Sequence, residues 1–215
     1  MPKGSAEVTL GRRNEIINAC AKLYKTMSFK DITIKDIGSA TSFTRTSIYN
    51  YFQTKEEIFL ALLQQEYEAW VADLERLTAA YDALSAARLA EELALSLERR
   101  ALLLKLMCMN NYDMEANSSD ERLAAFKRVY GASLMALDRC LIHFRPEMTA
   151  PQRESFLYAF LPFVYGIYPY TSVTPKQERA MQTAQVPFVH HSIYELVVNC
   201  LRHLLHDEKK EGLIE

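Results

Sequence analysis

A run of hydrogen-bonding side chains lies between residues 44 and 50 of this 215-residue sequence. Every member carries a donor or an acceptor: Thr44, Arg45, Thr46, Ser47, Tyr49 and Asn50. When a helix enters the major groove of DNA, Arg recognises guanine and Asn recognises adenine through paired hydrogen bonds. The segment therefore predicts a helix whose outer face contacts base edges.

Three side chains, with Tyr49 of this run among them, suit contacts with phosphate groups. Thr33 and Tyr49 carry hydroxyl groups near the segment, and contacts of this kind orient a protein on DNA without specifying a sequence. Lys55 lies at the expected N-terminus of a helix. Free N–H groups and the helix dipole favour an anion there, and the ammonium group adds to that attraction.

A helix-turn-helix would position these side chains. Two short helices are expected at 34–40 and 45–52, with Thr33 and Thr44 as their N-caps. The motif needs apolar residues on facing sides, a small contact residue and a turn. Six residues have the required offsets: Ile34, Ile37, Gly38, Phe43, Ile48 and Tyr51. The alternative is a pair of ordinary helices with one polar face.

The charge distribution supports a polyanionic partner for this part of the chain. The net charge is −2 overall, but residues 1–55 carry +5 and the remainder −7. A basic N-terminal segment joined to an acidic body is typical of a protein whose first domain binds nucleic acid. A chance asymmetry of surface charge is the alternative.

Helical periodicity dominates the remaining sequence, so we expect an all-α fold. The first helix should span 9–27. A Thr54–Glu57 capping box should open a helix to residue 80, and Ser118–Glu121 should open one that ends before Pro146. The other expected helices are 86–96, 98–111, 150–170 with Thr149 as N-cap, 175–184 with Thr174 as N-cap, and 187–206. Pro162 and Pro169 should kink the helix at 150–170 or end it early. The charge changes sign near Thr54, which predicts domains at 1–54 and 55–215.

Other classes of protein find little support in the sequence. It contains no Gly-rich phosphate loop, no GxSxG, no HExxH and no CxxC pair, so we expect no enzyme activity and no cofactor. The scattered cysteines, Cys20, Cys108, Cys140 and Cys200, are typical of reduced core thiols. No apolar run reaches membrane-spanning length, and we expect a cytoplasmic protein. Cys200, His203 and His206 recur every three residues near His190 and His191, but solvated or interface histidines are favoured over a metal site.

A family resemblance rests on the same residues. Residues 48–57, Ile-Tyr-Asn-Tyr-Phe-x-x-Lys-Glu-Glu, follow Thr33-Ile34-x-x-Ile37 and resemble the signature of the TetR family of transcriptional regulators. The resemblance covers about the first 60 residues. It implies phosphate contacts by Thr33, Tyr49 and Lys55, and a recognition helix that carries Thr44, Arg45, Thr46, Ser47 and Asn50. Ser42 replaces the usual turn glycine and should adopt a left-handed or similar turn conformation; Thr46 replaces a small residue.

The resemblance also implies a ligand pocket and a homodimer. The dimer should form through the helices near 150–170 and 187–206, and a palindromic duplex operator should be released when a small, mainly apolar ligand binds. Candidate pocket residues are aromatic or flexible and apolar: Trp70, Leu103, Met107, Met109, Tyr112, Phe126, Tyr130, Phe163, Tyr165, Tyr168 and Tyr170. Packed core is the alternative interpretation of this set. An activator, a regulator controlled by a protein partner, and a helical enzyme with a vestigial DNA-binding domain also remain open.

Overall fold

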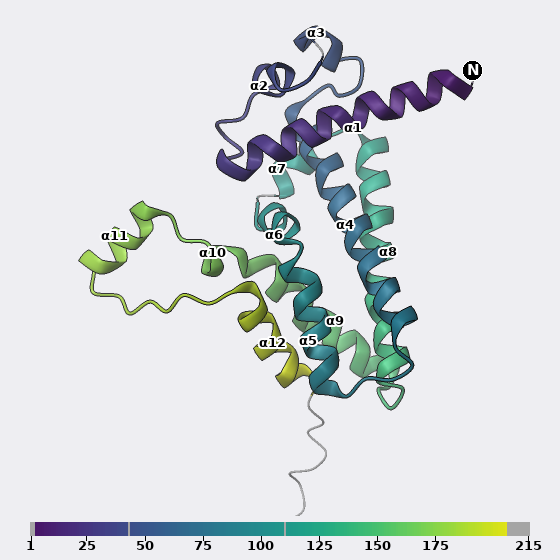
Figure 1. Ribbon diagram of the computed structural model, residues 1–215, viewed down its shortest axis with the longest axis vertical. Helices are drawn as coiled ribbons and strands as arrows, with labels where there is room; N and C mark the ends of the chain where they lie inside the picture. The colour runs from purple at the N-terminus through teal and green to yellow at the C-terminus, as the bar shows by residue number, and fades with distance from the viewer. Residues whose placement is uncertain (1–2, 43, 110, 206–215) are drawn as a thin grey trace, which may run out of the picture. The chain divides into compact units, whose positions relative to one another are not determined.

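The computed structural model describes residues 3–42, 44–109 and 111–205 (Figure 1). The fold is all-α, as predicted, and the described residues contain no strand. The chain divides into two compact units, a head unit (Met1–Tyr67 with Asn110–Tyr130) and a body unit (Glu68–Met109 with Gly131–Glu215). Helices α4 (Lys55–Ala80) and α8 (Asp120–Phe144) contribute residues to both units. A division of function between 1–54 and 55–215 stays a prediction.

The head unit contains α1 (Lys3–Thr26), α2 (Ile34–Ser39), α3 (Arg45–Ile48), α7 (Asn111–Ala116) and parts of α4 and α8. Its core is formed by apolar side chains from all of these helices and from the segment after α3. Fully buried members include Ile16, Cys20, Ile37, Ile48, Phe52 and Phe59. Phe59 also makes edge-to-face contacts with Tyr24 and Phe29, with ring centroids 5.1 and 4.8 Å apart. Such pairs stabilise a core beyond the apolar area that they bury.

The predicted N-caps of the two short helices are confirmed. The Thr33 side chain accepts a hydrogen bond from the Asp36 N–H, and the Asp36 carboxylate accepts one from the Thr33 N–H, which completes a capping box. Thr44 accepts a hydrogen bond from the Ser47 N–H. Helix α3 is only four residues long. Hydrogen-bonded turns follow it as far as Phe52. The expected helix at 45–52 is therefore a helix only over its first four residues.

The body unit contains the remainder of α4 and α8 together with α5 (Ala86–Glu98), α6 (Ala101–Met107), α9 (Ala150–Gly166), α10 (Tyr168–Thr171), α11 (Pro175–Thr183) and α12 (Ile193–Leu204). Helix α12 packs against α5 and α9, and α6 packs against α9 and α10. The buried Trp70 donates from its indole N–H to the Ser96 hydroxyl at 3.2 Å. Asp73 is buried as well and pairs with Arg100 at 2.7 Å and with Arg76.

Several predicted helix boundaries are wrong. The expected helix at 98–111 is α6 followed by a separate α7, and α8 begins at Asp120 because the Ser118 hydroxyl donates to the Met114 carbonyl oxygen. The helix at 150–170 breaks at Ile167, as expected from the nearby Pro169, which has no N–H to continue the ladder, while Pro162 stays inside α9. The last helix begins at Ile193, six residues later than expected, where Ser192 and Glu195 form a capping box.

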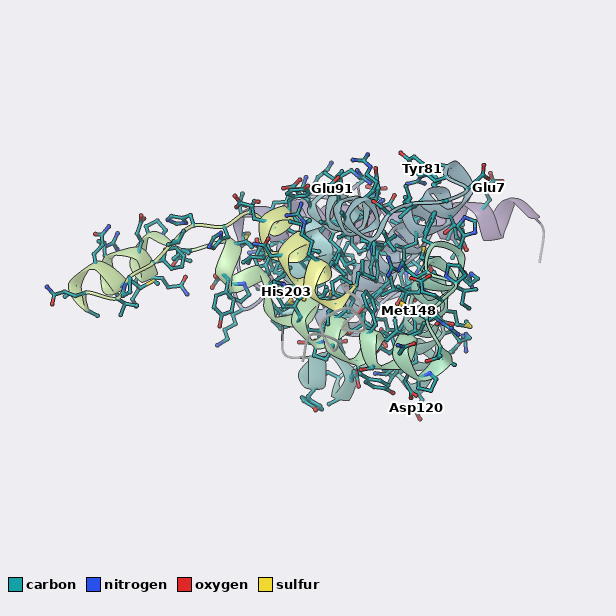
Figure 2. All side chains as sticks on the ribbon, turned by 90° about the horizontal axis from the view of Figure 1, so that it is seen from below. Glu7, Tyr81, Glu91, Asp120, Met148 and His203 are labelled. Carbon is teal, nitrogen blue, oxygen red and sulfur yellow. The ribbon has the colours of Figure 1, made fainter. Side chains whose placement is uncertain are left out.

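Helix α11 lies on an excursion of the body unit between α10 and α12 (Figure 1), and Figure 2 shows the same excursion with its side chains. Every α11 side chain is exposed except the half-buried Met181. The predicted capping box of Thr174 and Gln177 opens this helix, and that of Thr149 and Gln152 opens α9. Among the described residues, no helix has the length and apolar character needed to cross a membrane.

Candidate nucleic-acid interface

The recognition segment, which we define as residues 44–52, exposes polar side chains on a firmly packed turn. Thr44, Thr46 and Asn50 are exposed, while Ser47 and Tyr49 are half-buried. Ile48 is fully buried and attaches the segment to the core. The Arg45 backbone lies in α3, but its side chain lies outside the described residues. The structure thus presents the described polar candidates over one short stretch of surface.

The turn between α2 and α3 is held in a way that the sequence did not predict. Ser42 was expected to adopt a left-handed or similar turn conformation. The left-handed alternative is wrong, because among the described residues only Gln185 has a positive φ, at 55°. The Ser42 N–H instead donates to the carboxylate of Glu15 on α1 at 2.6 Å. A glycine is not required because the backbone stays in the region open to all residues. Gly38 is buried, as predicted, whereas Phe43 lies outside the described residues.

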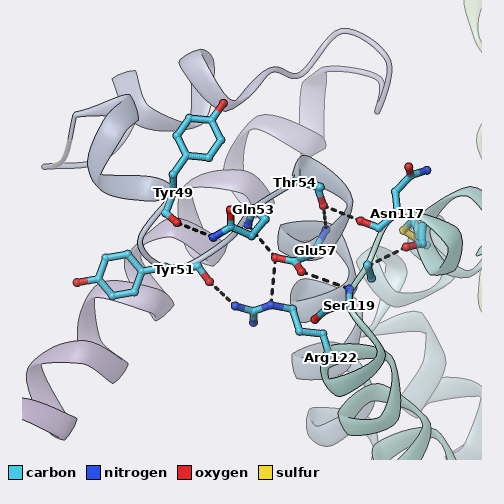
Figure 3. A network of polar contacts seen from close by, with 10 residues as sticks. Tyr49, Tyr51, Gln53, Thr54, Glu57, Asn117, Ser119 and Arg122 are labelled. Carbon is cyan, nitrogen blue, oxygen red and sulfur yellow. Dashed lines mark hydrogen bonds and ion pairs between the residues drawn. The ribbon is translucent and has the colours of Figure 1, made fainter.

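The three predicted phosphate contacts differ in their present partners. Thr33 is exposed, and its hydroxyl donates to the Asp36 carboxylate at 2.6 Å. This bond and that from the Thr33 N–H lower the pKa of Asp36 below its ordinary value. The Tyr49 ring points away from the network of Figure 3, while its carbonyl oxygen accepts a hydrogen bond from the Gln53 amide at 2.9 Å. These hydroxyl groups therefore lie at the surface of the recognition segment or beside it.

Lys55 contacts the loop after α1. Its ammonium group donates to the Phe29 carbonyl oxygen at 2.8 Å and lies 4.2 Å from the centroid of the Phe29 ring. An ammonium group has three donors. One bond to Phe29 is therefore compatible with a second bond to a phosphate oxygen at the start of α4.

A polar network joins the recognition segment to the start of α8 (Figure 3). The nearly buried Glu57 carboxylate accepts hydrogen bonds from the N–H groups of Gln53 at 2.8 Å and Ser119 at 3.4 Å. Thr54 caps α4 as predicted, since its hydroxyl accepts from the Glu57 N–H at 3.1 Å and also donates to the Asn117 carbonyl oxygen at 2.9 Å. Glu57 was visible in the sequence as part of a capping box. Its partners Ser119 and Arg122 were missed because they lie more than 60 residues away.

The structure places the predicted pocket residues in both units. In the head unit, Phe126 is buried, Tyr130 is half-buried and Tyr112 is 85% exposed. Tyr67 packs against Phe126 and Tyr130, with ring centroids 6.0 and 5.9 Å apart. Tyr112 does not share that burial, and its solvent exposure does not resemble that of a pocket lining.

The body unit holds the other members of the set. Trp70, Leu103 and Met107 are buried at 0 to 1% exposure. Phe163, Tyr168, Met109 and Tyr165 are half-buried, and Tyr170 is 67% exposed. The packing of α6 against α9 and α10 brings the helix of Leu103 and Met107 next to those of Phe163 and Tyr168. A pocket built from these residues stays a prediction.

Three cavities are lined by other residues. Two lie in the body unit, with volumes of about 350 and 260 Å³, and the larger is lined by Asp73, Arg76, Leu77, Ala80, Tyr81, Glu92, Ser96 and Arg99. The third lies in the head unit and has a volume of about 390 Å³. Its lining is largely polar: Arg13, Gln53, Glu57, Leu60, Ala61, Gln64, Ser119, Glu121, Arg122 and Ala125. None of the predicted pocket residues lines these three cavities.

The His and Cys residues near the C-terminus do not form a metal site in the described part of the chain. His206 lies outside the described residues, and the His203 ring nitrogen Nδ1 lies 2.7 Å from the Asn199 carbonyl oxygen. Burial raises the pKa of the Cys200 thiol. No group of three or more His, Cys, Asp or Glu residues among the described residues is placed to hold a metal ion.

Two family models match the chain. Residues 16–62 match the model of bacterial regulatory proteins of the tetR family, and residues 64–206 match a tetracyclin repressor-like C-terminal domain. No curated protein matches the chain. The first match covers the helix-turn-helix and the first turns of α4, and the second covers most of the remaining helices.

Solved structures of regulators have a similar fold. A TetR/AcrR-family regulator from Thermobifida fusca shares 18% identity over 92% of this chain and 98% of its own, with a TM-score of 0.62. The fatty acid degradation regulator FadR of Bacillus halodurans shares 16% identity over 94% and 96%, with a TM-score of 0.57. The FadR repressor of Thermus thermophilus, solved with lauroyl-CoA, shares 18% over 95% and 96%, with a TM-score of 0.54. With both family models matched over 16–62 and 64–206, this chain belongs to the TetR family of transcriptional regulators.

Proposed function

We propose that the protein is a sequence-specific DNA-binding repressor that leaves its operator when a small, mainly apolar ligand binds. The observation that supports this most strongly is the recognition segment, where Thr44, Thr46 and Asn50 are exposed around the buried Ile48. The charge of +5 over residues 1–55 attracts the duplex to this end of the chain. The protein acts by binding and carries out no catalysis, and it works in the cytoplasm, where the duplex is accessible.

The side chains divide into two roles. Arg45 and Asn50 recognise bases together with Thr44, Thr46 and Ser47, whereas Thr33, Tyr49 and Lys55 bind phosphate groups. A homodimer through α9 and α12 supplies two recognition segments. Two half-sites about 34 Å apart, one turn of the duplex, then form a palindromic operator.

The effector is mainly apolar because the candidate lining is aromatic or aliphatic. Trp70, Leu103, Met107, Phe163 and Tyr168 are buried or half-buried in the body unit. Two FadR structures of similar fold were solved with lauroyl-CoA and with stearoyl-CoA, ligands with long apolar chains. A ligand releases the operator only if it binds the released conformation more tightly than the DNA-bound one.

Two substitutions separate the roles of phosphate and base contacts. Lys55→Ala should weaken binding to every duplex sequence by roughly tenfold and reduce the salt slope by about one, because one charged phosphate contact is lost. Arg45→Ala should in addition relax the base preference. Fluorescence anisotropy over a salt series with operator and scrambled duplexes measures both effects, and Lys22→Ala, exposed on α1, is the matched control. If both variants changed specificity and left the salt slope alone, the assigned roles would be wrong.

Thermal denaturation and operator release test the effector. Lauroyl-CoA and free fatty acids should raise the melting temperature and lower operator affinity, whereas small polar metabolites should do neither. Stabilisation by small polar compounds alone would contradict an apolar effector. Operator binding that no small ligand changes would favour an activator or a regulator controlled by a protein partner.

A further inference from the structure

Arg122 makes three contacts with the recognition segment and the start of α4, although it lies 71 residues after Tyr51 in the sequence. Its Nε lies 3.1 Å from the Glu57 carboxylate, with which it forms an ion pair, and its Nη2 donates to the Tyr51 carbonyl oxygen. The guanidinium carbon lies 4.8 Å from the centroid of the Phe52 ring. All of these residues belong to the head unit, and Figure 3 shows the guanidinium group between Tyr51 and Glu57.

The recognition segment needs such contacts because it is too short to hold its own shape. A helix of four residues has no cooperative stability, and the carbonyl groups at its C-terminal end lack partners within the helix. Two of the carbonyl groups after α3 are satisfied by side chains: the Gln53 amide donates to Tyr49, and Arg122 donates to Tyr51. The orientation of the segment therefore depends on its burial through Ile48 and Phe52 and on these side-chain donors.

An arginine suits position 122 because of where the Glu57 carboxylate and the Tyr51 carbonyl oxygen lie. Glu57 is 3% exposed, and a buried carboxylate is strongly destabilising unless an opposite charge compensates it. A planar guanidinium group donates in two directions at once, so it can bind the Glu57 carboxylate and the Tyr51 carbonyl together. A lysine ammonium is a point charge and does not reproduce that fork.

We propose that Arg122 is a positioning residue for DNA binding, which holds residues 44–53 in their binding orientation from α8 without touching DNA. The proposal rests on the DNA-binding function proposed above. It differs from the roles of Arg45 and Lys55, because Arg122 acts through the main chain of the recognition segment. Its loss should lower affinity without removing a phosphate contact.

Arg122→Ala, Arg122→Lys and Arg128→Gln form the set of variants. Arg128 lies on the exposed face of α8 in the same unit and controls for the loss of one positive charge. Arg122→Ala should weaken operator binding by roughly tenfold or more with an unchanged salt slope, and Arg122→Lys should be intermediate. Arg128→Gln should bind within about twofold of the wild type, because an exposed single charge contributes little.

Chemical rescue separates positioning from general destabilisation. The 390 Å³ cavity of the head unit is lined by Arg122, Glu57 and Gln53, so truncation to alanine leaves an accessible space of guanidinium size beside the same acceptors. Methylguanidinium at millimolar concentration should restore much of the affinity of Arg122→Ala. It should not increase the affinity of the wild type or of Arg128→Gln, and methylammonium at equal ionic strength should restore nothing.

Amide hydrogen exchange provides a readout that does not require DNA. The amides of residues 44–53 should exchange faster in Arg122→Ala, and methylguanidinium should slow them again.

Unchanged exchange and unchanged affinity in Arg122→Ala would overturn the proposal, and so would a salt slope reduced by about one, because it would show a direct phosphate contact. If Arg122→Ala does not fold, Arg122→Lys decides by the same measurements. If the wild type binds no operator but the amides of residues 44–53 exchange faster in Arg122→Ala, the proposed DNA-binding function is wrong. Arg122 would then still be shown to hold the recognition segment in place.

Discussion

The recognition segment and the predicted effector pocket were both inferred from side-chain type and spacing. In the structure, the residues of the first lie together, whereas those of the second are spread over several helices. The recognition residues lie within one turn and its continuation, so that neighbours in the sequence are neighbours on the surface. The pocket candidates lie on helices from both units, and their exposure ranges from 0% at Trp70 to 85% at Tyr112. Spacing therefore identifies a site built from one short segment. It does not distinguish a packed core from a pocket when the residues come from several helices.

Trp70→Ala is expected to have the largest effect on stability and tests whether that residue is core. Trp70 is fully buried, and its indole N–H donates to Ser96. Its truncation should lower the free energy of unfolding by about 3–5 kcal/mol, measured by denaturant titration. Tyr112→Ala is the matched control and should change stability by less than about 0.5 kcal/mol. A loss below about 1 kcal/mol would show that Trp70 is not a tightly packed part of the core.

The same contrast explains which sequence predictions succeeded. The caps at Thr33, Thr44 and Thr174 depend on residues three positions away, and all three are present. The conformation of Ser42 depends on Glu15 on another helix, and the contacts of Glu57 depend on Arg122. The end of α6 at Met107 and the start of α12 after Ser192 were missed. In both places apolar residues continue beyond the end of the helix, so the sequence pattern does not mark the boundary. Local chemistry was predictable here, and contacts across long stretches of sequence were not.

The pH dependence of stability tests the packing of the head unit. Burial raises the pKa of the Cys20 thiol from 9.0 to about 12, a shift that the nearby Lys55 ammonium partly offsets. The unfolded chain loses this proton near pH 9 while the folded protein keeps it. The contribution of the protonated Cys20 thiol to the free energy of unfolding is therefore complete below pH 9. It is lost as the pH rises towards 12, by at most about 1.4 kcal/mol per pH unit.

Comparison with Cys20→Ala isolates this effect. Urea titrations from pH 8 to 11 should show the wild type losing stability relative to the variant above pH 9. Cys108→Ala should give a smaller difference, because the Cys108 thiol lies nearer to solvent. Parallel pH profiles for wild type and Cys20→Ala would show that water reaches Cys20 in the folded head unit.

Substitutions of two N-cap residues, one in each unit, should have the smallest effects on stability. Thr33→Ala and Thr174→Ala each remove the hydroxyl of a capping box, at a local cost of about 1 kcal/mol. Only Thr33→Ala should also weaken operator binding, because α11 lies in the body unit. In addition, the pKa of Asp36 should rise towards its ordinary value in that variant, as followed by NMR titration. Equal loss of operator affinity in both variants would contradict a role for Thr33 at the interface.

The central claim is that the recognition segment binds a specific duplex sequence as part of a dimer. Selection of bound sequences from a random duplex pool, with purified protein at two salt concentrations, tests it most directly. The account predicts a palindrome whose half-sites lie about one helical turn apart and that is recovered at both salt concentrations. Recovery of no motif, with binding lost at moderate salt, would show only nonspecific attraction to phosphate groups and would contradict the account.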